Sequence, residues 1–391
     1  MRLGLYIDAM YRTGEDGRVL TNFETLPFLR FGCEVGRHFD ELVLFGREAP
    51  DGAGATYPLA AGPVVAPLPW YPSLAHVGRF AAALARTVPA LWRGVGRVDV
   101  VWTFGPHPVS LLLALLALAR GRRVVLGVRQ DTMRYFAARL RRRGAAPLLA
   151  PLWVLDRAWR ALARRVPATV VGTSLERRYG GPRPGLLAMT VSLVREREVA
   201  AEPRPAPPRA VELLTVGRIE PEKNPLLLVE ALAELSAGGD REWRLTWIGT
   251  GRMADAVLAR AQELGIGDRV ELPGFVPPGE ALMARYAAAD AFVHVAVTEG
   301  VPQVLLEALA AGTPVVATDV GGVRAALDGG AAGLLVPPRD RNALVAAIRS
   351  LVEDEDGRAR RARRGLALAR ERTLEAEARR VAAHVAGAAG G

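Results

Sequence analysis

The sequence predicts an α/β fold made of two doubly wound domains, each built on a mostly parallel sheet. Short apolar runs suited to buried strands alternate with helical patterns along the whole chain, which is typical of stacked βα units. At 391 residues, the chain is longer than one hydrophobic core usually serves. Four prolines fall within six residues of segment 198–209, which therefore forms neither a helix nor a central strand and is expected to link the domains.

Eleven apolar runs have the length and composition of strands in such sheets. In the first half they are residues 2–8, 41–45, 98–103, 123–128 and 168–172. In the second half they are residues 211–216, 244–248, 269–272, 291–295, 314–317 and 333–336. Helices are expected at 108–120 and 147–165, and the Ala/Arg-rich segment 357–386 fits one long helix with an exposed charged face.

Three compositional features bear on where the protein works. The single cysteine, Cys33, rules out an intramolecular disulfide framework and is typical of a reducing compartment. The apolar run at the N-terminus is short and resembles a first strand rather than a signal peptide. The longest apolar run, Val109 to Ala119, has 11 residues, against the ~20 that a spanning helix needs, so a buried helix is expected. Together these features favour a cytoplasmic protein.

The positive charge is concentrated in the first half of the chain. The net charge is +10, with +13 on residues 1–200 and −3 on residues 201–391. Such a charge favours an anionic partner, which is a nucleic acid, an acidic membrane surface or a phosphorylated substrate.

Segment 139–165 mixes Arg with Trp and Leu, as does a helix that lies on a membrane surface. Its apolar positions 148, 152, 155, 159, 162 and 166 also form a stripe suited to core packing. Core packing with a basic outer face is favoured, and peripheral association with an anionic membrane stays open.

One basic residue differs in kind from all the others. Of the 51 basic residues, 50 are Arg, and Lys223 is the single Lys. A chain that uses Arg wherever either residue serves has kept Lys here, either by chance or because the site needs it. Lys is a compact point charge and Arg a planar fork, so a tight site that grips one phosphate oxygen can require Lys.

A candidate anion site lies where a buried strand of the second half ends. Gly217 and Arg218 follow that strand directly. Asn224 is expected as the N-cap of a helix that begins at Pro225. Arg218 and Lys223 are therefore expected together beside a positive helix end, a combination that can hold a diphosphate.

A second candidate anion site follows the strand 291–295. The loop carries Glu299 and Gly300, and Pro302 is expected to open a helix that ends before Gly312. Gly300 permits close backbone approach, and the free amides of residues 301–303 face any anion at the helix start. Glu299 is also explained as an ordinary acid at a helix N-terminus.

Glu307 is expected on the same helix face as Gln303, one turn further along. It lies in a run of Leu and Ala, where a carboxylate is costly unless it is hydrogen-bonded. A vicinal diol, such as a ribose, would satisfy it. The alternative is that Glu307 belongs to a solvated helix face.

The ordered set of these motifs closely resembles the C-terminal domain of retaining GT-B glycosyltransferases, family 4 or glycosyl transferases group 1. The motifs are Gly217-Arg218 with Lys223-Asn224, then Glu299 and Glu307, then the stretch from Ala311 to Gly322. The resemblance implies two Rossmann-like domains facing a central cleft. It assigns residues 1–197 to an acceptor-binding domain, 198–209 to the linker, 210–375 to the nucleotide-sugar-binding domain and 376–391 to a C-terminal helix and tail.

The resemblance also implies roles for individual residues. Arg218, Lys223 and Glu299 would be catalytic, with the two cations neutralising the donor diphosphate and Glu299 holding the transferred sugar. The donor-binding residues would be Gly217, Gly249, Gly251, Phe275, Val276, Gly300, Val301, Pro302, Gln303 and Glu307. Here Gly249 and Gly251 form a turn near the nucleotide, Phe275 and Val276 lie by the base, and Glu307 binds the ribose. Transfer with retention of anomeric configuration, with no metal and no cofactor, is expected.

In the first half the resemblance is fainter. His107 follows a strand, as does the histidine in the family's acceptor domain, although a lone His is equally explained as a structural cap. Arg129 and Asp131 stand where family members often have another histidine. The family's Gly-Gly pair in the first loop is absent, and Gly14, Gly17 and Arg18 are the candidates in its place.

The expected function is transfer of a hexosyl group from a nucleoside-diphosphate sugar to a glycan or lipid-linked acceptor, in cell-envelope or exopolysaccharide synthesis. One alternative is another GT-B activity, such as a nucleotide-sugar epimerase or a sugar-phosphate synthase. A nucleic-acid-binding protein is a further alternative, but the basic half lacks interleaved aromatic residues and a known reader motif, so no nucleic-acid partner is expected. The expected location is cytoplasmic, with peripheral association at the inner face of the membrane left open.

Overall fold

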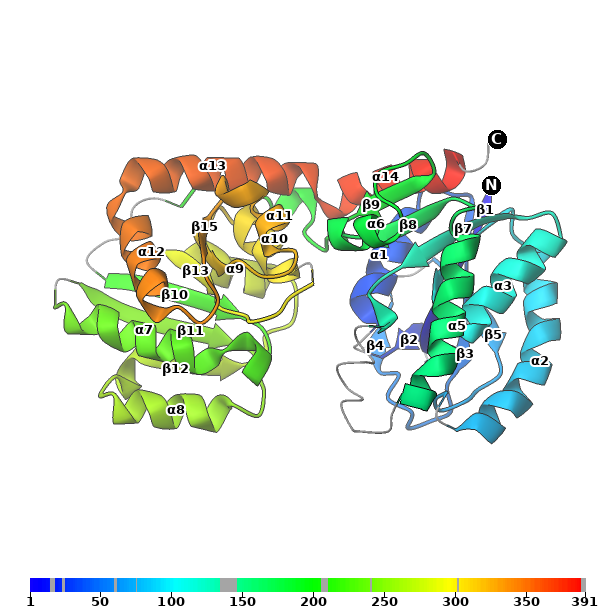
Figure 1. The fold of residues 1–391 in the computed structure, drawn as a ribbon, viewed down its shortest axis with the longest axis horizontal. Helices are drawn as coiled ribbons and strands as arrows, with labels where there is room; N and C mark the ends of the chain where they lie inside the picture. Colours follow the sequence, from blue (N-terminus) through cyan, green and yellow to red (C-terminus); the bar gives the residue numbers. More distant parts are fainter. Residues whose placement is uncertain are drawn as a thin grey trace. The chain divides into compact units, whose positions relative to one another are not determined.

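The computed structural model describes residues 1–14, 18–22, 25–59, 62–74, 76–133, 146–204, 210–239, 241–300 and 302–387. The chain divides into two compact units. Unit 1 contains Met1–Leu193 and Leu374–Gly391, and unit 2 is Val194–Thr373. Each unit has its own parallel sheet with helices on both faces (Figure 1), so the α/β class and the two doubly wound domains are confirmed.

The sheet of unit 1 has nine strands. They are β1 (Arg2–Thr13), β2 (Val19–Thr21), β3 (Glu41–Glu48), β4 (Tyr57–Pro58), β5 (Val64–Leu68), β6 (Val100–Gly105), β7 (Arg123–Val128), β8 (Ala168–Val171) and β9 (Leu186–Met189). The parallel strands run in the order β5-β3-β1-β6-β7-β8-β9, and the short strands β2 and β4 add an antiparallel extension beyond β1. The strand order reverses between β1 and β6, which is where doubly wound sheets bind ligands.

Helices pack on both faces of this sheet. On one face lie α1 (Leu26–Gly36) and α14 (Leu374–Gly387). On the other lie α2 (Val77–Val95), α3 (Pro108–Ala119), α5 (Ala146–Leu162) and α6 (Thr173–Arg178). The first core is centred on buried side chains such as Leu5, Phe31 and Val381, and the second on residues such as Leu113 and Trp159.

Unit 2 has a six-stranded, fully parallel sheet in the order β12-β11-β10-β13-β14-β15. Its strands are β10 (Ala210–Val216), β11 (Glu242–Ile248), β12 (Val270–Gly274), β13 (Ala291–His294), β14 (Val315–Thr318) and β15 (Leu334–Val336). One face of the sheet carries α7 (Pro225–Ala237), α8 (Ala254–Glu263) and α12 (Arg341–Glu353). The other face carries α9 (Glu280–Ala288), α10 (Gln303–Ala310), α11 (Val323–Ala326) and α13 (Glu355–Glu371). The strand order reverses between β10 and β13.

Every strand expected from the sequence is present, but four further strands, β2, β4, β5 and β9, were not expected. Strand β9 has the sequence Leu-Leu-Ala-Met, which has a high helix propensity and becomes a strand only by pairing with β8. Helix α3 was expected to be buried, yet Leu115 is 51% exposed and Leu118 is also exposed.

The single long helix expected over 357–386 is wrong. The structure has α13 ending at Glu371 and α14 beginning at Leu374, with Thr373 buried between them. The break is where the chain returns from unit 2 to unit 1. The apolar positions before and after the break pack into different cores, which a single helical pattern in the sequence does not reveal.

The first part of the proline-rich segment is packed on unit 2. The Ala200 amide donates to the Ala310 carbonyl at 2.8 Å, and the Arg204 amide donates to the Gly312 carbonyl at 3.1 Å. The Arg204 guanidinium pairs with the buried Asp290 at 3.1 Å. Residues 205–209 lie outside the described part of the chain.

Candidate functional site

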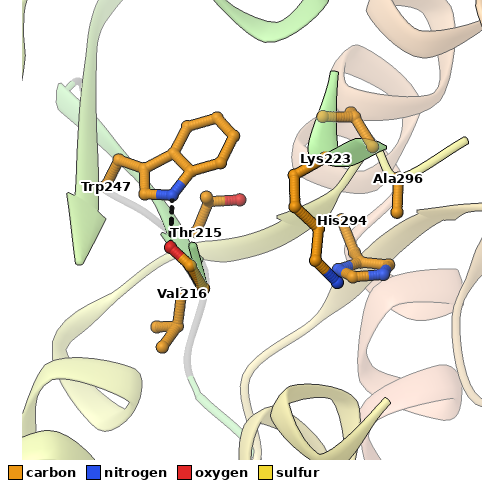
Figure 2. Close-up of a pocket in the computed structure, with 8 residues that line it drawn as sticks. Thr215, Val216, Lys223, Trp247, His294 and Ala296 are labelled. Carbon is orange, nitrogen blue, oxygen red and sulfur yellow. Dashed lines mark hydrogen bonds between the residues drawn. The ribbon is translucent and has the colours of Figure 1, made fainter. Parts of the chain in front are cut away.

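A small pocket opens in unit 2 at the carboxyl ends of β10 and β13, where the strand order reverses. Its lining residues are Thr215, Val216, Gly217, Lys223, Trp247, His294, Val295 and Ala296. Figure 2 shows Lys223 and His294 with their side-chain nitrogens near each other on one side, and Trp247 on the other. The segments after β10 and after β13, where the sequence predicts two anion sites, come together at this pocket.

Glycines allow the turns beside the pocket to approach closely. Gly217 and Gly249 have φ of 144° and 145°, a conformation that favours glycine. A Cβ on Gly249 would lie 2.1 Å from the Gly217 carbonyl oxygen, and one on Gly251 would lie 2.3 Å from the Ile219 oxygen. The indole nitrogen of Trp247 donates to the Gly217 carbonyl at 3.0 Å. The turns that end β10 and β11 are therefore held in contact, as the expected glycine-rich turn requires.

Lys223 points into the site and contacts the loop that follows β13. It ends the 3-10 turn η2 (Pro221–Lys223), and the Val297 amide donates to the Glu222 carbonyl at 2.9 Å, which joins that turn to the loop. The Lys223 ammonium binds the Glu299 carboxylate, and the two side chains are only 20% and 17% exposed. Two residues that the sequence places 76 positions apart therefore form one charged pair.

His294, at the end of β13, contacts the same carboxylate. Its Nε2 lies 3.3 Å from Glu299 Oε2, and its side chain is buried. Burial opposes ionisation of Glu299, but the close approach of His294 and the charge and hydrogen bond of Lys223 outweigh it and lower the pKa of Glu299 to about 2. Glu299 is therefore a carboxylate throughout the physiological range. His294 was not among the site residues predicted from the sequence, although it ends an apolar strand beside the motif.

The loop around Glu299 is fixed by backbone contacts. The Gly322 amide donates to the Gly300 carbonyl at 2.8 Å, and the Gly300 amide lies 3.3 Å from Glu299 Oε1. A Cβ on Gly321 would lie 1.9 Å from the Glu299 carbonyl oxygen. Helix α10 begins at Gln303 with Pro302 as its N-cap, and Val301 lies outside the described residues.

In the first expected anion site, Arg218 and Lys223 have different carboxylate partners. The Arg218 guanidinium pairs with Glu222 at 2.8 Å, and its side chain is 72% exposed. Helix α7 begins at Pro225 with Asn224 as its N-cap residue, as expected from the sequence. Asn224 adopts the left-handed φ of 52°, however, and its side chain makes no capping hydrogen bond.

Glu307 is half-buried and faces Tyr286 of α9. The Tyr286 hydroxyl donates to Glu307 Oε2 at 2.7 Å, and Tyr286 is itself fully buried. Burial raises the pKa of Glu307, and the Tyr286 hydrogen bond opposes that rise. The protein therefore supplies one of the donors that this carboxylate needs, and the predicted binding of a diol by Glu307 stays a prediction. Phe275 and Val276 follow β12, with Phe275 half-exposed and Val276 packed against the core.

His107 in unit 1 is the N-cap of α3, with Nδ1 accepting from the Val109 amide at 3.3 Å. Its Nε2 lies 3.7 Å from Asp8 Oδ2. Burial lowers the pKa of His107; Asp8 opposes this shift, and Arg47 adds to it. Asp8 also pairs with Arg47 at 3.2 Å and accepts from the Tyr71 hydroxyl at 3.1 Å. Asp8 was not predicted as a site residue, although a single acidic residue in an otherwise apolar strand is a recognisable feature of a site.

The other candidates in unit 1 make contacts of their own. Asp131 is ion-paired with Arg178, which also reaches the buried Asp156 at 3.4 Å. The Arg129 guanidinium lies 5.5 Å from the centre of the Phe28 ring. The Gly14 amide donates to the Arg18 carbonyl at 2.8 Å, which closes the turn between β1 and β2. Gly17 lies outside the described residues.

The described residues contain neither a group of metal ligands nor a helix that could span a membrane. No three His, Cys, Asp or Glu side chains among them are grouped so as to hold a metal ion. None of the helices in the described ranges is both long enough and apolar enough to cross a membrane.

Residues 196–367 match the family described as glycosyl transferases group 1. The D-inositol 3-phosphate glycosyltransferase of Nocardia farcinica is 40% identical over 149 residues, covering 36% of this chain and 32% of that protein. A putative colanic acid biosynthesis glycosyltransferase of Salmonella typhimurium is 33% identical over 147 residues, covering 36% of each. The chain thus aligns with about a third of the length of these curated relatives.

Solved structures match over nearly the whole chain. HepE of Anabaena, in complex with UDP, has a TM-score of 0.67 at 17% identity and covers 99% of both chains. WaaG, a glycosyltransferase involved in lipopolysaccharide biosynthesis, has a TM-score of 0.66 at 17% identity, covering 98% of this chain and all of its own. These likenesses extend the comparison to unit 1, which the family match over residues 196–367 does not reach. The chain has the GT-B fold, and its residues 196–367 match glycosyl transferases group 1.

Proposed function

We propose that the protein transfers a hexosyl group from a nucleoside-diphosphate sugar to a hydroxyl of a glycan or lipid-linked acceptor. The observation that carries this proposal is the Lys223–Glu299 pair beside the pocket of unit 2. One neighbour of the same fold supports the choice of donor, since HepE was solved with UDP and with UDP-glucose. Relatives named for colanic acid and lipopolysaccharide synthesis support a role in cell-envelope or exopolysaccharide assembly.

In this proposal the charged groups of unit 2 act on the leaving diphosphate. The bond between the anomeric carbon and the diphosphate oxygen breaks, and the electron pair leaves with the diphosphate. Lys223 and the amino end of α10 would stabilise that negative charge, which is the main demand of an oxocarbenium-like transition state. The acceptor oxygen then bonds to the anomeric carbon and gives its proton to the departing diphosphate oxygen.

Glu299 would hold the transferred sugar, and Glu307 the ribose. Glu299 suits this part because its low pKa keeps it an acceptor for sugar hydroxyls at neutral pH. Arg218, as the exposed cation beside Gly217, would reach the diphosphate only by leaving Glu222. Retention of anomeric configuration, without a metal or cofactor, is part of the proposal and rests on the family resemblance.

Calorimetric titration of the full chain with UDP, GDP and ADP tests the donor site. We expect one of them to bind, and we expect Lys223→Ala to weaken that binding at least about tenfold, because a buried cation partner of the phosphate is lost. Absence of binding to all three would contradict the proposal. With the matching nucleotide sugar, NMR of the product shows whether the anomeric configuration is retained.

An alternative within the same fold is a nucleotide-sugar epimerase or a sugar-phosphate synthase. A sucrose-phosphate synthase of Thermosynechococcus elongatus shares the fold, with a TM-score of 0.64. Turnover of the donor without a glycosidic product indicates epimerisation, and a phosphorylated disaccharide indicates the synthase. Binding of DNA that falls steeply with salt and shows no sequence preference would be only electrostatic.

We also propose that unit 1 associates peripherally with an anionic membrane at the cytoplasmic face. Trp153, on α5, is 49% exposed, its neighbour Val154 is exposed, and the Arg157 guanidinium lies 4.8 Å from the Trp153 ring centre. Exposed aromatic and basic side chains together are what an interfacial helix uses. Sedimentation with phosphatidylglycerol and phosphatidylcholine vesicles tests this: we expect binding to the first only, reduced by Trp153→Asp. Equal binding to both, or none, would contradict it.

A further inference from the structure

Asp8 occupies in unit 1 the same topological position that the donor site occupies in unit 2. Strand β1 pairs with β3 on one side and with β6 on the other, so the strand order of unit 1 reverses at β1 and β6. Asp8 lies on β1 just beyond the residues that pair with β6, and His107 follows the end of β6. In doubly wound sheets this crevice is where ligands bind.

The two oxygens of Asp8 have different surroundings. Oδ1 is held by Arg47 at 3.2 Å and by the Tyr71 hydroxyl at 3.1 Å. Oδ2 accepts no hydrogen bond from any residue in the described ranges, and His107 Nε2 lies 3.7 Å from it. The Asp8 side chain is nevertheless 38% exposed. One oxygen is therefore committed to the protein, and the other is fixed in place and available.

The groups behind Asp8 are buried and already engaged. Arg47 is held by the Tyr71 carbonyl at 2.7 Å and lies 4.5 Å from the Tyr71 ring centre. Because His107 Nδ1 accepts from the Val109 amide, the ring carries its proton on Nε2, which is buried, faces Asp8 and has no hydrogen-bond partner within the described part of the chain. At 3.7 Å, this donor lies close to Asp8 without covering its free oxygen.

We propose that Asp8 binds a hydroxyl group of a neutral sugar through Oδ2, and that this is the acceptor side of the reaction; the acceptor role rests on the proposed glycosyltransferase function. A carboxylate oxygen accepts hydrogen bonds only, so its ligand must donate one. An anionic group is disfavoured here, because Arg47 is buried and neutralised by Asp8, and the N-terminal amide of α3 is taken by His107.

This inference sets the protein apart from relatives whose acceptor is phosphorylated. The sequence relatives named for D-inositol 3-phosphate align with about a third of this chain, and the family match begins only at residue 196. Their acceptor therefore does not carry over to unit 1. The site at Asp8 calls for an acceptor whose bound sugar carries no phosphate or carboxylate at this position.

Saturation-transfer NMR on the full chain, with UDP present, tests the site with defined probes. The neutral probes are the p-nitrophenyl glycosides of glucose, galactose and mannose, and the anionic probes are glucose 6-phosphate and glucuronate. We expect at least one neutral glycoside to bind and both anions to bind more weakly. Binding of the anions alone, or of none of the five, would overturn the proposal.

Asp8→Asn replaces the free acceptor oxygen by an amide, and Asp99→Asn is the matched control. Asp99 lies in the same unit, and its side chain is 37% exposed. We expect Asp8→Asn to weaken glycoside binding at least about tenfold, as the loss of a hydrogen bond to a charged group predicts, and Asp99→Asn to leave it within about twofold. Equal effects of the two changes would overturn the proposal.

Two measurements separate this inference from the proposed function. UDP binding by calorimetry tests unit 2 by itself, so a failure there counts against the donor proposal whatever the sugars do. Thermal unfolding shows whether the Asp8→Asn variant is folded. If it is not folded, the proposal is tested by the wild-type protein alone, through the difference in its binding of neutral and anionic probes.

Discussion

At the scale of single residues, the site depends on the difference between an ammonium and a guanidinium. Lys223 is the one Lys in the chain, and it is mostly buried against Glu299 and close to His294. A compact charge fits between a carboxylate and a bound phosphate oxygen, whereas a planar fork needs more room. The composition that drew attention to position 223 and the packing around it therefore agree.

Lys223→Arg is expected to lower kcat/KM by about a hundredfold while leaving the net charge unchanged, because the guanidinium cannot reproduce the single-point contact. Steady-state kinetics with the donor identified by calorimetry would measure it. Arg252→Lys is the control, since Arg252 is exposed and pairs with Glu220 on the surface. Full activity of Lys223→Arg would show that only the charge matters.

Glu299 links the site to stability at low pH. Its pKa is about 2 in the folded chain against 4.5 for the free side chain, so its ionised form stabilises unit 2 by at most ~3 kcal/mol. Because the pKa is depressed, that stability is fully present above pH 4.5 and is lost as the pH falls toward 2. We expect Glu299→Gln to destabilise unit 2 at pH 7 and to match the wild type near pH 2.

Hydrogen exchange of α10 peptides at pH 7, 4 and 3 measures this difference, after correction for the intrinsic pH dependence of exchange. A gap between wild type and Glu299→Gln that stays constant with pH would contradict the depressed pKa.

The sequence predicted which residues of the site are charged better than it predicted which residues they pair with. Lys223 and Glu299 were both selected, but their pairing joins segments 76 residues apart and depends on how β10 and β13 lie in the sheet. Arg218 was expected beside Lys223 because the strand ends at Gly217 and the chain turns between the two cations, yet Arg218 pairs with Glu222 instead. His294 and Asp8 were missed because the apolar patterns of their strands mask single polar positions.

At the scale of elements, the ends of parallel strands position the site, and glycines let those ends meet. The turns after β10 and β11 touch at Gly217 and Gly249, where the carbonyl of one approaches the Cα of the other. Strand positions could be predicted because buried strands leave a strong apolar pattern. The short strands β2, β4 and β5 could not, since they are two to five residues long and gain their form from pairing with neighbours.

Gly249→Ala and Gly217→Ala form a matched pair for this contact. Both glycines have nearly the same φ, so the conformational cost of alanine is similar, but only Gly249 has an atom within 4 Å of the added Cβ. We expect Gly217→Ala to cost about 1 to 2 kcal/mol and Gly249→Ala at least ~2 kcal/mol more. Chemical unfolding followed by circular dichroism measures both. Equal losses would mean that the turn relaxes away from the clash.

At the scale of the whole molecule, the last helix belongs to the first unit. Leu374, Ala378, Val381 and Val385 of α14 are buried in the same core as Phe31 of α1. The Thr190 amide donates to the buried Glu377 at 3.2 Å, which fixes α14 beside the end of β9. Sequence patterns alone placed this segment as a tail, because nothing local reveals which core a helix completes.

Removing residues 374–391 is therefore expected to destabilise unit 1, by on the order of 5 kcal/mol from the apolar side chains lost. Peptides from α1 and β1 should exchange hydrogen faster, while peptides from α7 and β11 in unit 2 serve as the internal reference. Unchanged exchange in α1, or a larger change in α7, would contradict the assignment of α14 to unit 1.

The two crossings of the chain, before Val194 and after Thr373, have a consequence for biosynthesis. The ribosome makes all of unit 2 before it makes the helix that completes the core of unit 1. Unit 2 therefore does not need residues 374–391 to fold, whereas unit 1 does. Nascent chains in which residue 373 is followed by an unstructured linker long enough to span the ribosome exit tunnel should thus hold a protease-resistant unit 2 and a protease-sensitive unit 1.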